Sequence, residues 1–145
     1  MRIIPYEEQY RDDMIFMVLS AKDALGRVPH LNGDLLDVKK HYLDAGTGFW
    51  LALDESGRVI GCVGYKLEDT PGAARLHRLY VKPSCKRQGI GSALLETAEA
   101  AMKARNIQEI RVHLGEPREQ WFESYSFYPK HGYREYAPRW MRKEL

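Results

Sequence analysis

The chain has 145 residues, of which 44% are hydrophobic, and its formal net charge at neutral pH is +2. This length and apolar fraction predict one globular domain over residues 1–145 and exclude general disorder, while so small a charge argues against nucleic-acid binding through bulk electrostatics. No apolar run is long enough to cross a membrane, and two widely spaced cysteines, Cys62 and Cys85, predict free thiols in a reducing cytoplasm and no metal site.

Apolar periodicity in the first half of the chain predicts a strand, two helices and a hairpin. In chain order these are a strand at 2–4, a helix at 7–25, a short helix at 34–44, and strands at 49–53 and 59–67. Gly26 ends the first helix, and Glu55-Ser56-Gly57 forms the turn of the hairpin.

The second half alternates strands with helices. It predicts a strand at 75–81, a helix at 89–105, a strand at 110–114, a short aromatic helix at 120–128 and a last strand at 133–140. Together the elements indicate an α+β fold, in which helices cover both faces of a mixed, mostly antiparallel sheet.

The junction between the strand at 75–81 and the next helix carries the most chemical information. It reads Leu79-Tyr80-Val81, a turn at Pro83, and then Lys86-Arg87-Gln88-Gly89-Ile90-Gly91-Ser92. Glycines let the backbone approach a ligand closely, and the helix that follows directs unpaired N–H groups and its positive dipole end at the same place. With two cations beside it, the segment predicts a site for a phosphorylated ligand.

Motif spacing excludes two common phosphate-binding loops. A P-loop ends in Gly-Lys-Ser/Thr, whereas Gly91 is followed by Ser92 and Ala93. A dinucleotide-binding loop has a third small residue where this chain has Leu94. A basic-x-x-Gly-x-Gly loop and a glycine turn that only caps a helix both remain, and ATP or NAD stays an alternative ligand.

This loop resembles the pyrophosphate loop of the GNAT superfamily of acyl-CoA-dependent N-acyltransferases, whose motif is Arg/Gln-x-x-Gly-x-Gly/Ala. The first position is Lys86 here, which keeps the charge but not the usual side chain. Phe127-Tyr128-Pro129-Lys130-His131-Gly132 resembles the family's Tyr-x-x-x-Gly-Phe/Tyr signature, and the resemblance extends from Met1 to about Tyr136. It implies an αβα layered domain with a splayed, bulged central strand.

The resemblance also implies a cofactor, acetyl-CoA, and residues that bind it. The strand residues Leu79, Tyr80 and Val81 would carry the pantetheine arm. The pyrophosphate would lie against Lys86, Arg87, Gln88, Gly89, Ile90, Gly91 and Ser92. Trp121 stands where the family often has an asparagine that bonds the arm, so this tryptophan either contacts the cofactor or simply packs.

The strand at 75–81 breaks its own alternation. Leu76 and Leu79 are three residues apart, but Leu79 and Val81 are two apart, so a bulge would restore all three to one face. Alternatively, Leu76 faces the other layer of helices. The family has a bulge in this strand, which implies that the Leu79 N–H stabilises the oxyanion of the reaction.

Tyr128 matches the general acid of the family. A phenol with a pKa of about 10 can protonate a departing thiolate at neutral pH. Its alternative role is that of a core aromatic, because other aromatic residues surround it in the sequence.

The general base is left open by the sequence. Many family members have a glutamate at the position of Arg75, which cannot accept a proton. His77 lies two residues further on and is the candidate base, although a structural histidine or a chain of waters is an alternative. Other titratable residues near the expected cleft are Glu68, Asp69, His113 and Glu116.

The expected function is transfer of an acetyl group to a primary amine on a small molecule or a peptide. The acceptor would lie between the first two helices and the loop after the strand at 110–114, near His30, Glu116 and Glu119. A non-catalytic module that senses acyl-CoA is the alternative, favoured by Arg75 and opposed by Tyr128. We expect a monomer or a homodimer.

Overall fold

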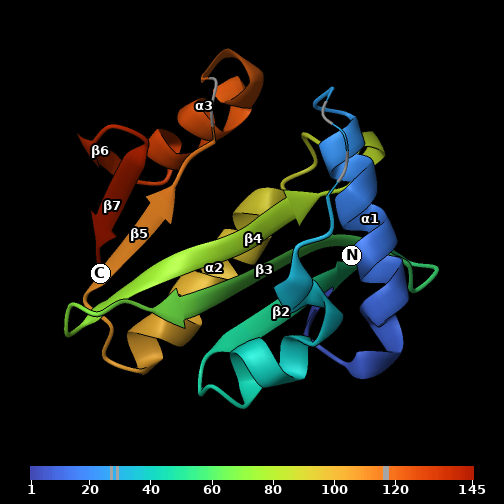
Figure 1. The fold of residues 1–145 in the computed structure, drawn as a ribbon, viewed down its shortest axis with the longest axis horizontal. Helices are drawn as coiled ribbons and strands as arrows, with labels where there is room; N and C mark the ends of the chain where they lie inside the picture. Colours follow the sequence, from blue (N-terminus) through green and yellow to red (C-terminus); the bar gives the residue numbers. More distant parts are fainter. Residues whose placement is uncertain (27, 29, 116–117) are drawn as a thin grey trace.

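A computed structural model describes residues 1–26, 28, 30–115 and 118–145 of the chain (Figure 1). The strands are β1 (Arg2–Pro5), β2 (Gly48–Leu53), β3 (Val59–Leu67), β4 (Ala73–Val81), β5 (Glu109–His113), β6 (Arg134–Ala137) and β7 (Trp140–Glu144). The α-helices are α1 (Arg11–Asp23), α2 (Ile90–Ala104) and α3 (Phe122–Lys130). Short helical turns are η1 (Glu8–Tyr10), η2 (Gly33–Leu36), η3 (Lys39–Leu43), η4 (Pro83–Cys85) and η5 (Arg118–Trp121).

The strands form one sheet in the order β1-β2-β3-β4-β5-β7-β6, in which β4 and β5 are parallel and the other pairs are antiparallel. Side chains of a strand alternate between the two faces of a sheet. In β2, Phe49 and Leu51 therefore pack with α1, η2 and η3, whereas Ala52 packs with α2 and α3. In Figure 1, α2 crosses behind β3 and β4. The predicted mixed sheet with helices on both faces is confirmed.

The sheet opens between its two parallel strands. β4 pairs with β5 only from Ala73 to Arg75, opposite Glu109 to Arg111. Beyond that point the strands diverge, and Figure 1 shows β5 leading away from β4 toward α3. The predicted splay of the central strand is confirmed, and it leaves the last residues of β4 open on one side.

β4 also contains the predicted bulge. Cys62 on β3 lies opposite Tyr80, and Gly64 lies opposite His77, so β4 holds one residue more than β3 in this interval. Arg78 takes the irregular position, with a left-handed φ of 58°. Leu76 and Leu79 consequently face the same layer, that of α2, and the alternative placement of Leu76 is wrong.

The helix expected at 120–128 begins within the turn η5, and its α-helical part, α3, extends to Lys130. Three other predicted elements also differ from the structure. The helix expected at 7–25 begins as the turn η1, and its α-helical part, α1, ends at Asp23. The helix expected at 34–44 is two short turns, η2 and the π-type η3. The strand expected at 133–140 is the hairpin of β6 and β7, because Pro138 cannot donate to a ladder and Arg139 turns the chain with a φ of 69°.

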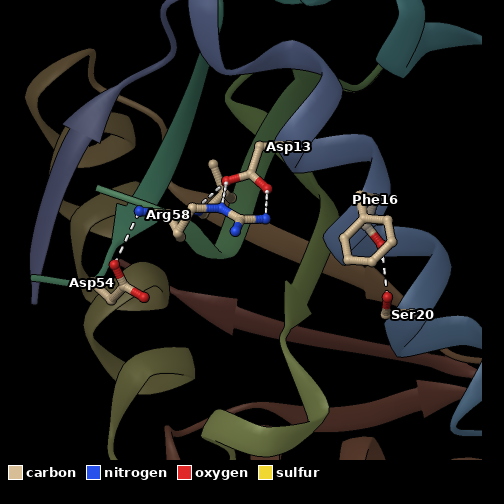
Figure 2. A network of polar contacts seen from close by, with 6 residues as sticks. Asp13, Phe16, Ser20, Asp54 and Arg58 are labelled. Atoms are coloured by element: carbon tan, nitrogen blue, oxygen red, sulfur yellow. Dashed lines mark hydrogen bonds and ion pairs between the residues drawn. The ribbon is translucent and has the colours of Figure 1, made fainter. Parts of the chain in front are cut away.

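A polar network fastens α1 to the turn between β2 and β3 (Figure 2). The carboxylate of Asp13 accepts hydrogen bonds from Nε and Nη2 of Arg58, at 3.0 and 2.7 Å, and from the N–H of Val59 at 2.8 Å. Asp54 caps the same turn by accepting from the N–H groups of Ser56 and Arg58. The network holds the α1 layer in place on the face of the sheet that carries His77.

In the part of the chain that the structure describes, no helix has both the length and the apolar character needed to span a bilayer.

Candidate active site

The basic segment between η4 and α2 folds into a tight loop through two left-handed residues. Arg87 has a φ of 63°, and Gly89, which precedes the first turn of α2, has a φ of 79°. Glycine adopts this conformation without the steric cost that a Cβ atom adds. No side chain caps this end of α2, so its first N–H groups remain available to an anion.

A cavity of about 630 Å³ lies beside this loop, between the end of β4 and α3. We call it the loop cavity. Residues of the predicted cofactor site that line it are Leu79, Val81, Lys86, Arg87, Gly89, Ile90, Gly91, Ser92 and Tyr128. Gln88, by contrast, is exposed to solvent and is not among the lining residues.

Gly91 lies where β4 and α3 approach each other. A Cβ atom at this position would lie 3.5 Å from the ring of Phe127 and 3.6 Å from Cγ2 of Val81. A methyl group would therefore fit, but a larger side chain would fill the space between the strand and the helix.

Two polar contacts connect the loop with α3. Nζ of Lys86 donates to Oε2 of Glu123 at 2.7 Å, and Oγ of Ser92 lies 3.0 Å from Nε2 of His131. Lys86, predicted to contact phosphate, is therefore paired with a carboxylate of α3.

A second cavity, of about 350 Å³, lies where β4 and β5 separate. We call it the splay cavity. It shares Leu79, Ser124 and Tyr128 with the loop cavity. A molecule held by the loop can therefore meet a second molecule at these three residues.

The bulge in β4 forms one wall of this junction and is fixed by side chains. Nε and Nη2 of Arg78 donate to the two carboxylate oxygens of Asp34, at 3.1 and 3.0 Å, and the hydroxyl of Tyr42 also donates to Asp34. The Cys62 thiol donates to the Arg78 carbonyl at 3.2 Å. Burial alone would raise the pKa of Asp34, but the hydrogen bonds from Arg78 and Tyr42 outweigh it and hold this pKa below its ordinary value.

Tyr128 packs at the junction with only 8% of its surface exposed. Its ring meets those of Phe127 and Tyr133 edge to face, at centroid distances of 5.2 and 5.4 Å. Burial, together with the nearby Tyr80, raises the pKa of the Tyr128 phenol, so the hydroxyl stays protonated at neutral pH. It can serve as a proton donor there.

His77 points to the α1 face of β4, where Nε of Arg75 donates to its Nε2 at 2.9 Å. An accepting Nε2 requires the neutral ring with its proton on Nδ1. Burial lowers the pKa of His77 to about 4, assisted by the positive charges of Arg75, Arg78 and Lys66. His77 is therefore neutral near pH 7 but only weakly basic.

The family model for the acetyltransferase (GNAT) domain matches residues 45–135. The chain belongs to the GNAT family of acetyltransferases. This confirms the resemblance seen in the loop at 86–91 and in the signature at 128–132, both of which lie within the matched residues. None of the curated protein sequences matches the chain.

Solved GNAT structures have the same fold as this acetyltransferase. A GNAT acetyltransferase from Staphylococcus aureus Mu50 aligns with a TM-score of 0.89 at 23% identity, covering 99% of this chain and 98% of that one. PaiA N-acetyltransferase from Thermoplasma acidophilum, solved with coenzyme A, aligns over both whole chains with a TM-score of 0.75 at 21% identity. A phosphinothricin acetyltransferase from Sinorhizobium meliloti, solved with acetyl-CoA, has a TM-score of 0.75 at 15% identity and covers 99% of this chain and 88% of that one.

Trp121 of the acetyltransferase lines the splay cavity rather than the loop cavity. Its indole lies over Gly115, where an added Cβ would come within 2.2 Å of the ring. The packing role is thus the one that the structure accounts for, and a contact with the cofactor stays a prediction. Tyr80 likewise lines the splay cavity, and its side chain packs toward α1.

The other titratable candidates are dispersed. His113 lines the splay cavity and stacks on Trp140 at 4.5 Å, and Glu68 lies 3.6 Å from Arg75. Asp69 and His30 are exposed. Glu116 and the side chain of Glu119 lie outside the described residues. Among those described, no group of three His, Cys, Asp or Glu side chains is placed to hold a metal ion.

Sequence reasoning missed three residues of the acetyltransferase site. Asp34 reaches the bulge from 44 positions away, and no motif marks it. Arg139 lies in the turn between β6 and β7, where a single strand was predicted, and this turn brings it to the splay cavity. Ser124 lines both cavities from α3, and its place four residues before Tyr128 on a helical face was the one available signal.

Proposed function

We propose that this acetyltransferase moves the acetyl group of acetyl-CoA to a primary amine on a small molecule or a peptide. The observation that carries the proposal is the meeting of the two cavities at Leu79, Ser124 and Tyr128. One cavity contains an anion-binding helix terminus and the other contains none of the loop residues. Two substrates can therefore enter separately and react at the junction.

In this proposal the loop cavity holds acetyl-CoA. The pyrophosphate lies against the N–H groups at Gly89, Ile90 and Gly91, and the pantetheine arm follows the backbone from Val81 to Leu79. Solved GNAT relatives that contain CoA or acetyl-CoA support this choice of cofactor. The thioester then lies beside Tyr128, at the junction.

The reaction begins with attack of a neutral amine on the thioester carbon, which forms the C–N bond. The N–H of Leu79, beside the bulge, donates to the oxygen that becomes negative. The C–S bond then breaks, and Tyr128 gives its proton to the thiolate sulfur. The products are an amide and CoA thiol, and Tyr128 regains a proton from water.

The proton lost by the amine goes to His77 or to water. With a pKa of about 4, His77 is a poor acceptor for a proton from an ammonium ion at equilibrium. It can accept a proton as the C–N bond forms, because the amine nitrogen becomes far more acidic at that stage. Because Nε2 of His77 already accepts from Nε of Arg75, we propose that His77 takes this proton only when that hydrogen bond opens, and that water is the acceptor otherwise.

An acceptor screen that measures released CoA thiol and the mass of the acetylated product tests the proposal. Wild-type protein should release thiol only with an amine present, and the product should gain one acetyl group. Binding of acetyl-CoA without turnover of any amine would instead support a module that senses acyl-CoA.

A further inference from the structure

The splay cavity, where the acceptor would bind, is lined by cationic and aromatic groups. Among its described lining residues are three arginines and two histidines, and no aspartate or glutamate: Arg75, Arg78, Arg139, His77 and His113. The bidentate contact with Asp34 neutralises Arg78. Nε of Arg139 donates to the Leu114 carbonyl at 3.2 Å.

Arg75 keeps donors available to a ligand. Its Nε donates to His77, and its nearest approach to a carboxylate is 3.6 Å, from the same Nε to Glu68. Its two terminal nitrogens make no hydrogen bond to any described residue, and 35% of the side chain is exposed. The guanidinium carbon of Arg75 lies over the ring of Trp140, 5.7 Å from its centroid.

A guanidinium with two free terminal nitrogens matches a carboxylate or phosphonate in geometry and charge. The pKa of the neighbouring His77 also reflects the positive charges around this cavity. Burial, followed by the charges of Arg75, Arg78 and Lys66, lowers the pKa of His77. The Arg75 guanidinium in the cavity lining repels further positive charge, so a diamine or an aminoglycoside with several ammonium groups is a poor match.

We propose that Arg75 binds an anionic group of the acceptor, so that the preferred acceptors are amines that also carry a carboxylate, phosphonate or phosphinate. This inference rests on the proposed acetyl transfer and names its acceptor class. Arg75 then replaces the glutamate of other family members with a different task. It orients the acceptor by its anion, while the amine reaches the thioester near Leu79 and Tyr128.

Matched acceptors separate charge from shape. We would measure CoA-thiol release with α-amino acids, with ω-amino acids of increasing chain length and with aminophosphonates. Each acid is compared with its uncharged carboxamide or ester, and polyamines and an aminoglycoside complete the panel. For the best acid, kcat/KM should exceed that of its amide at least about tenfold, as expected for a charge-assisted hydrogen bond.

Variants assign this preference to Arg75. In Arg75→Gln the acid-to-amide ratio should fall to within about threefold, mainly through a higher KM for the acid. Arg75→Lys keeps the positive charge but not the planar, two-pronged donor geometry of the guanidinium, so its acid-to-amide ratio should lie between those of wild type and Arg75→Gln. The control Arg134→Gln removes an equal charge from the exposed edge strand β6 and should leave the ratio unchanged.

The outcomes separate the two proposals. If amides, polyamines or aminoglycosides react as fast as the acids, acetyl transfer stands and the anionic-acceptor inference is overturned. The inference is also overturned if Arg75→Gln keeps the full acid preference while a thermal unfolding curve shows that the variant is folded. If no amine of any class releases thiol, the proposed acetyl transfer fails, and the acceptor class fails with it.

Discussion

Asp34 binds Arg78 through two hydrogen bonds, at 3.0 and 3.1 Å, and Arg78 is the left-handed residue of the β4 bulge. The turn η2 thus fixes the conformation of the strand beside which the thioester is expected to lie. The Asp34 side chain is only 10% exposed, so the pair is weakly screened. This contact links a loop with no chemistry of its own to the position of the Leu79 N–H.

Asp34→Asn should lower both stability and turnover. Loss of a charge-assisted pair of this kind costs about 1.5–3 kcal/mol of unfolding free energy, and a loosened bulge should lower kcat more than acetyl-CoA affinity. Asp13→Asn is the matched control, since Asp13 binds Arg58 in the same two-point manner away from both cavities. It should lose stability by urea denaturation but keep its kcat. Equal kcat losses in the two variants would show that Asp34 acts through stability alone.

Gly89→Val and Gly91→Val should both weaken CoA binding sharply. At Gly89 the cause is strain, because its φ is 79°, and at Gly91 the added side chain would fill the space beside Phe127 and Val81. Isothermal calorimetry with CoA measures the effect. Gly57→Val, in the β2–β3 turn with a φ of 80°, introduces similar strain and should leave CoA affinity unchanged. Unaltered affinity in both loop variants would rule out the pyrophosphate assignment.

Glu123→Gln should tighten CoA binding by about twofold to fivefold. Nζ of Lys86 lies 2.7 Å from Oε2 of Glu123, and removing the carboxylate's charge makes the cation more available to phosphate. An exposed interaction of this kind contributes about 0.3–1 kcal/mol. Lys86→Ala should weaken binding by a comparably small factor, less than either glycine variant. Abolished binding in Lys86→Ala, with binding retained in the glycine variants, contradicts the loop geometry proposed here.

Tyr128→Phe should lower kcat by about 10²–10⁴, the range for a positioned acid. CoA affinity should stay within a few fold, because the loop is untouched and the ring still packs against Phe127 and Tyr133. Tyr125→Phe is the control on the same helix, since its hydroxyl donates only to the Gly115 carbonyl at 3.4 Å. Wild-type turnover by Tyr128→Phe at saturating acetyl-CoA would return Tyr128 to a purely structural role.

His77 should make stability depend on pH between 6.5 and about 4. Its pKa falls from 6.5 to about 4 on folding, so the unfolded chain binds a proton that the folded chain does not. Stability is therefore lost as pH decreases through this interval. Urea denaturation should show a smaller loss in His77→Gln, while the exposed His30→Gln should resemble wild type. If His77 also accepts the amine proton, its variant should flatten the acidic limb of the pH–rate profile near pH 4.

Local sequence was sufficient to predict a structural feature where the residues that signal the feature also form it. The spacing of Gly89 and Gly91 predicted a loop that opens a helix, and α2 begins at Ile90. The interrupted alternation at Leu76 and Leu79 allowed a bulge, the resemblance to the GNAT family favoured it, and β4 contains it. The single strand predicted at 133–140 was wrong because Pro138 and Arg139 form a turn there, and Pro138 was the local signal of that turn.

The sequence by itself determined the α+β class, the glycine turn that opens α2 and the family, because each depends on residue types at short, regular intervals. Only the tertiary structure decided which distant side chains meet: Asp34 with Arg78, Lys86 with Glu123, and Arg75 with Trp140. The physical reason is that these contacts depend on how far β5 diverges from β4 and on how α3 and η2 pack against the sheet. Such distances follow from the summed packing of the whole core, which no local pattern encodes.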